Sequence, residues 1–94
     1  MYARVVRFTD VDPERIAAIT ARIQEADGPP EGVDSTGMKM IYDDSQSTAV
    51  FVGFFETEEK MREGGKVLEA MDSDQTPGTR ASIDNGEIKV ETDA

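Results

Sequence analysis

Two arginines interrupt the first apolar stretch of the chain, Arg4 and Arg7 within residues 2–9. A guanidinium carries a planar fork of hydrogen-bond donors that matches a carboxylate or a phenolate, so either arginine could bind such a group in a pocket. Because they are three positions apart, a β-strand would direct them to opposite faces. The alternatives are an arginine that buries its stem and keeps its head in water, or one that forms a salt bridge across a subunit interface.

Tyr42 and Gly65 are the other two candidate ligand-binding residues. Tyr42 ends a short apolar stretch beside Asp43 and Asp44, and its hydroxyl could orient a phenolic or enolic ligand; packing at a strand end is the alternative. Gly65 follows Gly64 in the middle of a predicted helix, where each glycine costs about 0.5–1 kcal/mol relative to alanine. We therefore expect a close helix–sheet approach, a kink or space for a ligand at this doublet.

Several kinds of chemistry are excluded by residues that the chain lacks. It contains no histidine and no cysteine, which removes the usual general base near neutral pH, the thiolate ligand and the disulfide. The stretch 72–83 begins like a calcium-binding loop, but it lacks the glycine at the sixth position and the glutamate at the twelfth. The sequence therefore predicts no metal site and no cofactor, and it leaves catalytic residues unassigned.

Length and charge limit the partners. The 94 residues predict one domain, 1–94, and the formal net charge of −10 repels nucleic acid and anionic membranes. No apolar stretch approaches the ~20 residues that span a bilayer, and no charged-then-apolar leader is present. We expect a cytoplasmic protein with no nucleic acid or membrane partner.

The elements that must position these residues follow from local patterns. Residues 2–9, 38–42 and 48–55 are rich in β-branched, methionine and aromatic side chains and predict three strands. Helices are predicted after Asp12-Pro13 and after Thr57, since each of these residues can cap or open a helix. Their apolar stripes are formed by Ile16, Ile19 and Ile23, and by Met61, Gly65, Leu68 and Met71.

The last part of the chain allows two arrangements. Residues 80–83 and 87–91 are both strand-like, and Asp84-Asn85-Gly86 lies between them. An Asn-Gly pair between two such segments is a strong hairpin signal. We expect the main strand at 87–91 with the Asn-Gly element before it; a single strand interrupted by a bulge is the alternative.

The third predicted strand, 48–55, is apolar on both of its faces. A sheet with one face in water normally alternates apolar and polar side chains. Helices of the same chain can cover one face, and a second subunit is the simplest cover for the other. The sequence therefore predicts a homodimer.

The order β-α-β-β-α-β predicts an α+β, ferredoxin-like domain: an antiparallel sheet with two helices on one face. Residues 37–68 resemble the dimeric α/β barrel superfamily, near the antibiotic biosynthesis monooxygenase-like proteins. The resemblance is carried by the short strand 38–42 and by Phe55-Glu56-Thr57, where an aromatic, an acid and a capping hydroxyl join strand to helix.

That resemblance implies two protomers that form a dimeric α/β barrel, with a pocket between each sheet and its helices. Members include cofactor-independent oxygenases of aromatic polyketides, haem-degrading oxygenases, isomerases and proteins without an assigned role. The haem-degrading members hold iron through a histidine, which this chain lacks.

We therefore expect a small-molecule-binding protein of this superfamily, without metal, haem or nucleotide, that takes a small apolar or aromatic ligand. One alternative is a cofactor-independent monooxygenase or isomerase that acts on an aromatic, polyketide-like substrate. In that case the protein would mainly desolvate and orient the substrate. The other alternative is a dimerisation module with no ligand.

Overall fold

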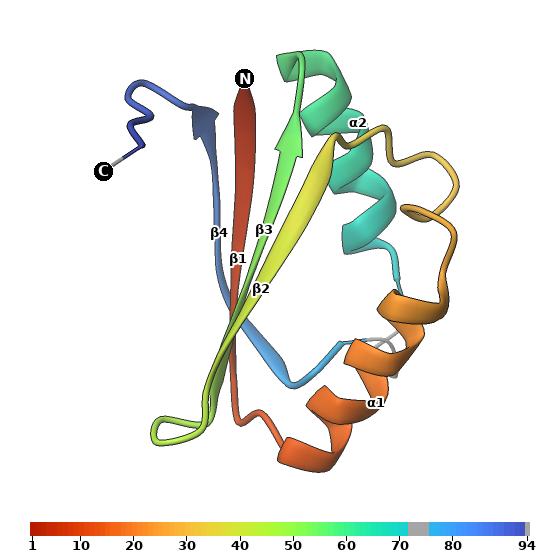
Figure 1. Ribbon diagram of the computed structural model, residues 1–94, viewed down its shortest axis with the longest axis vertical. Coiled ribbons are helices and arrows are strands. Elements are labelled where there is room, and N and C mark those ends of the chain that lie inside the picture. The colour runs from red at the N-terminus through yellow and green to blue at the C-terminus, as the bar shows by residue number, and fades with distance from the viewer. Residues whose placement is uncertain (72–75, 94) are drawn as a thin grey trace.

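The computed structural model describes residues 1–71 and 76–93. Its helices and strands follow one another in the order β1 (Tyr2–Thr9), α1 (Pro13–Glu25), β2 (Gly37–Asp43), β3 (Thr48–Phe55), α2 (Glu58–Glu69) and β4 (Thr79–Glu87). The strands form one antiparallel sheet in the order β2-β3-β1-β4. Both helices lie on the same side of the twisted sheet (Figure 1). This α+β architecture is compatible with a ferredoxin-like fold.

Both helices begin where the capping signals predict. The carboxylate of Asp12 accepts a hydrogen bond from the Glu14 backbone amide at 2.8 Å, and Pro13 occupies the first turn, where it leaves no intrahelical bond unmade. The hydroxyl of Thr57 accepts a hydrogen bond from the Lys60 amide at 3.1 Å. Each cap satisfies an amide that has no partner within the helix.

The core lies between the sheet and the helices and is divided into two clusters. The first joins β1 and β3 to α1, and the second joins β3 to α2 and to the linker before β2. Phe8 and Phe51 meet edge to face in the first cluster, with ring centroids 5.5 Å apart. The buried members are Val6, Phe8, Val11, Ile16 and Ala49 in the first cluster, and Val33, Phe55 and Met61 in the second.

The expectation of a main strand at 87–91 after an Asn-Gly turn is wrong. β4 is one continuous strand that ends at Glu87, and Asn85 and Gly86 lie inside it, paired with Arg4 and Ala3 of β1. Pairing of residues 82–87 with β1 supplies a ladder of backbone hydrogen bonds, which outweighs the local turn preference. The strand does contain a bulge, but nearer its start than Asn85-Gly86. The register shifts between Arg7 and Phe8, which leaves Ala81 as the extra residue.

The sheet face away from the helices, which we call the open face, is partly apolar. Its rows across β2, β3, β1 and β4 follow from the strand register and from the alternation of side chains. Apart from the C-terminal segment near one end, no segment within the described residues lies over this face (Figure 1). The rows are Gly37–Phe54–Ala3–Gly86, Lys39–Val52–Val5–Asp84 and Ile41–Val50–Arg7–Ser82.

Within residues 1–71 and 76–93, no helix has the length and apolar character needed to cross a membrane.

Candidate functional site

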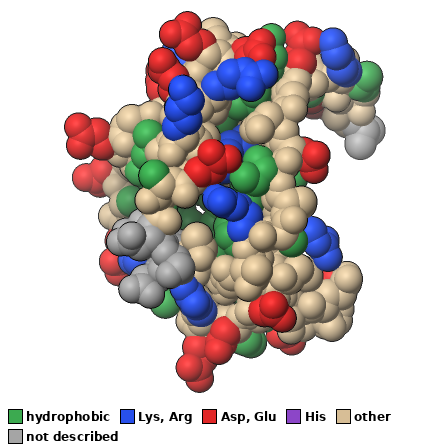
Figure 2. Space-filling model, turned by 180° about the vertical axis from the view of Figure 1, so that it is seen from behind, with side chains coloured by type: hydrophobic (Ala, Val, Ile, Leu, Met, Phe, Trp, Pro, Cys, Tyr) green, Lys and Arg blue, Asp and Glu red, His purple; other side chains and the backbone are tan. Residues whose placement is uncertain are grey.

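A cavity of about 710 Å³ lies between the sheet and the two helices. This volume falls within the range of about 300–1,000 Å³ that is usual for small-molecule sites. Figure 2, which views the molecule from behind Figure 1, shows a hollow with basic side chains beside it and many acidic side chains toward the outer edge. The cavity wall is mostly apolar; its members include Val6, Phe8, Ile19, Ile23, Val33, Phe51, Phe55, Leu68, Met71 and Pro77.

The cavity exists because the two helices cover opposite ends of the sheet. α2 lies over one end and α1 over the other, and their C-terminal ends approach each other near the middle (Figure 1). Ala26 after α1 and Met71 after α2 both line the space between them. The linker 28–37 also lines it, and the adjacent prolines Pro29 and Pro30 prevent the first helix from continuing across the gap.

Arg4 is the buried charge of this cavity, with only 6% of its surface exposed. Its guanidinium Nη2 lies 3.8 Å from Oε1 of Glu69, which is an ion pair at longer than hydrogen-bond distance. Burial lowers the pKa of Arg4, Glu69 opposes this shift, and the positive charge of Arg80 adds to it. An arginine nevertheless stays charged under all ordinary conditions, so the cavity holds a permanent cation.

Gly65 makes room for Arg4. A Cβ atom at this position would lie 3.1 Å from Nε of Arg4, tighter than an ordinary contact. Of the three alternatives stated for the glycine doublet, the structure therefore shows a close approach of helix and sheet. Gly64 has a different neighbour, since its Cβ would lie 2.9 Å from Cε1 of Phe55.

Two further arginines, Arg22 and Arg80, line the cavity, and neither was a candidate from the sequence. Arg22 lies in the last turn of α1, three residues after Ile19, so its helical spacing from the apolar stripe could have indicated it. The position of Arg80 could not be predicted from the sequence pattern. Only the bulge in β4 places Arg80 opposite Phe8, on the sheet face that borders the cavity.

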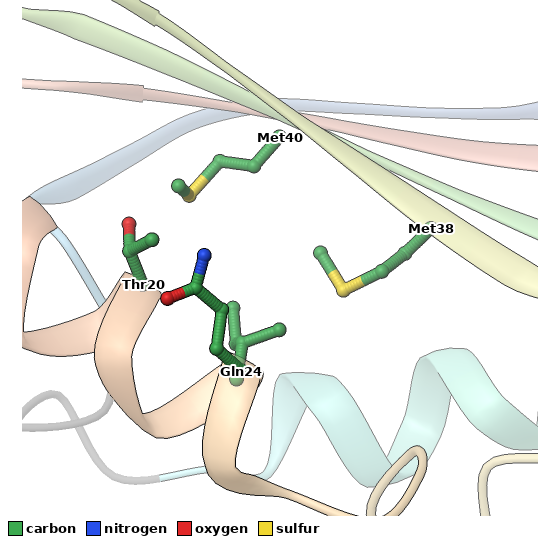
Figure 3. A pocket seen from close by; sticks show the side chains of 5 residues that line it. Thr20, Gln24, Met38 and Met40 are labelled. Atoms are coloured by element: carbon green, nitrogen blue, oxygen red, sulfur yellow. The ribbon is translucent and has the colours of Figure 1, made fainter.

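A smaller recess of about 180 Å³ adjoins the cavity between α1 and β2. Met38 and Met40 extend into it from β2, and Thr20 and Gln24 border it from α1 (Figure 3). Met38 and Ile23 line both spaces. Because methionine side chains are flexible and polarizable, this side of the wall can adapt to the shape of a bound molecule.

The four candidate residues from the sequence fall into two groups. Arg4 and Gly65 meet beside the cavity. Arg7 is exposed on the open face, opposite Val50 and Ser82. The ring of Tyr42 packs against the first core cluster and its hydroxyl donates a 2.8 Å hydrogen bond to Asp44, so neither residue lines the cavity.

Metal-ligating groups do not gather in the part of the chain that the structure describes. Among the described residues, no three carboxylate side chains lie close enough together to hold a metal ion. Residues 72–75, where the calcium-like stretch begins, lie outside the described residues.

Comparison of this chain with known protein families, with curated proteins and with solved structures finds no match.

Proposed function

We propose that this protein binds a small, largely apolar molecule between its sheet and helices, as a homodimer of the dimeric α/β barrel type. The observation that carries the proposal is the apolar cavity of about 710 Å³ that contains the buried charge of Arg4. Such sites combine apolar walls with a few placed polar groups that orient the ligand.

The wall composition favours binding over acid–base catalysis. Among the described residues that line the cavity, the ionisable side chains are the arginines Arg4, Arg22 and Arg80. Arginine neither takes nor gives a proton at ordinary pH, so it can orient an anion but cannot act as a general base. For this reason we place binding before the oxygenase or isomerase alternative.

A neutral apolar probe tests the binding proposal. We expect 2-naphthamide to bind the wild-type protein, as followed by calorimetry, because its bicyclic body suits an apolar cavity. Met38→Trp should weaken this binding about tenfold or more, since the larger ring occupies wall space that the cavity and the recess share. Val90→Trp is the control, because Val90 is 79% exposed and does not line the cavity. Failure of the wild-type protein to bind any such aromatic probe would contradict the proposal.

The open face supports the dimer. Its central row places Lys39 at the β2 edge, Val52 and Val5 in the middle, and Asp84 at the β4 edge. If two sheets stack on these faces about a two-fold axis parallel to the strands, the β2 edge of each lies over the β4 edge of the other. Lys39 of one copy then faces Asp84 of the second copy, and the valines meet between them. The row is thus complementary to itself in charge and in polarity.

A further inference from the structure

We propose that the ligand is an apolar acid, whose carboxylate pairs with Arg4 and replaces Glu69 as its counter-charge. This inference rests on the proposed function, and it specifies the chemical class of the bound molecule.

The first argument is the incomplete partnering of Arg4. A guanidinium has five N–H donors, and a buried one normally has hydrogen-bonded partners because its desolvation is costly. Within the described residues, Arg4 has one ion pair, at 3.8 Å, and no hydrogen bond, and its nitrogens are not fully sealed from solvent. Its head borders a cavity large enough for a second carboxylate. A carboxylate from the ligand would supply the close, paired bonds that Glu69 does not.

The second argument is the exposure of Glu69. Its side chain is 46% exposed, whereas that of Arg4 is 7% exposed. Glu69 is the last residue of α2, so its carboxylate can turn into water with little change in the helix. If the carboxylate of a ligand replaces that of Glu69, Arg4 keeps one negative partner. The new partner can approach to hydrogen-bond distance, which Glu69 does not.

The third argument concerns the number of charges on the ligand. Arg22 and Arg80 also line the cavity, which concentrates positive charge in one place on a chain of net charge −10. Both helices, however, direct their C-terminal ends toward this space (Figure 1), and these ends carry partial negative charge. The three arginines outweigh these two partial charges, so charge alone requires only that the ligand be an anion; the mostly apolar wall favours a carboxylate on an apolar body over a multiply charged phosphate.

A matched pair of probes tests the inference: 2-naphthoic acid, ionised at neutral pH, and 2-naphthamide, which has the same ring system without the charge. We expect calorimetry to show the acid bound about tenfold more tightly than the amide by the wild-type protein. Arg4→Met should remove this preference, so that the acid binds no more tightly than the amide. Arg7→Met is the matched control, because Arg7 lies on the same strand but on the open face.

Glu69→Gln provides an independent measurement if Arg4→Met does not fold, as checked by circular dichroism. This substitution removes the competing charge from a half-exposed position, so it should tighten binding of the acid and leave that of the amide unchanged. Equal wild-type affinities for acid and amide would overturn this inference alone. An equal loss of acid binding in Arg7→Met and Arg4→Met would do the same. Absence of binding by both probes would instead overturn the proposed function and this inference with it.

Discussion

The two adjacent glycines of α2 meet different kinds of neighbour. Gly64 faces the ring of Phe55, which is 1% exposed and lies in the second core cluster. Gly65 faces Nε and Cδ of Arg4, a long side chain that borders the cavity. Both side chains border the cavity, but the ring of Phe55 is held among the buried residues Val33 and Met61, whereas the long side chain of Arg4 can change its rotamer. The same substitution should therefore have different effects at two neighbouring positions.

We expect Gly64→Ala to lower the free energy of unfolding by about 1 kcal/mol, because overpacking against Phe55 costs more than the helix propensity of alanine returns. Gly65→Ala should leave stability unchanged or raise it by up to about 1 kcal/mol, since Arg4 can shift into the cavity. Urea denaturation of both variants measures the difference. Equal losses of stability at the two sites would show that Arg4 is held as firmly as Phe55.

At the scale of elements, the sequence predicted those features that depend on near neighbours in the chain. The helix starts at Pro13 and Glu58 were predictable because Asp12 and Thr57 cap them locally. The end of β4 was not predictable, because Asn85-Gly86 favours a turn and only pairing with β1 overrides it. A pocket between sheet and helices was expected from the family resemblance alone; its size and lining were beyond the sequence, since they depend on how far apart the two helices lie on the sheet.

The turn between β2 and β3 is held by hydrogen bonds to the carboxylate of Asp43. Asp43 accepts hydrogen bonds from the Ser45 amide at 3.0 Å, the Ser45 hydroxyl at 2.6 Å and the Gln46 side-chain amide at 2.7 Å. The bonds from the side chains of Ser45 and Gln46 are the main reason that the pKa of Asp43 lies below its ordinary value. Because these bonds favour the ionised form, they stabilise the folded hairpin only while Asp43 is charged.

Asp43→Asn should therefore lower stability at neutral pH. A carboxylate whose pKa is depressed by folding contributes stability above its unfolded pKa and loses that stability as pH falls through its folded pKa. The difference between wild type and variant should thus disappear in strong acid. Urea denaturation at neutral and acidic pH measures it, with Glu31→Gln as a control at an exposed position in the linker. A difference that persists in acid would contradict the role of the charge.

At the scale of the whole molecule, a net charge of −10 opposes the association of two copies, so a dimer needs specific attraction. The open face can provide it through Val5 and Val52 in the centre and the opposite charges of Lys39 and Asp84 at the edges. Such pairs fix the orientation of an interface as well as adding to its affinity.

Charge exchange tests this arrangement. Lys39→Asp and Asp84→Lys should each shift the protein toward monomer in light scattering, and the double variant should restore the dimer. Asp84→Lys is the informative single change, because it makes the chain less acidic and so reduces general repulsion while it still removes the specific pair. A wild-type protein that is monomeric at micromolar concentration would contradict the dimer itself.

The central position of β1 has a consequence for how this chain can vary. Its even-numbered residues Arg4, Val6 and Phe8 line the cavity, and its odd-numbered residues Val5 and Arg7 lie on the open face. Insertion or deletion of one residue in this strand would exchange the two sets and place a guanidinium where a valine now packs. Related chains must therefore keep the length of this segment, as well as the size of its buried residues Val6 and Phe8.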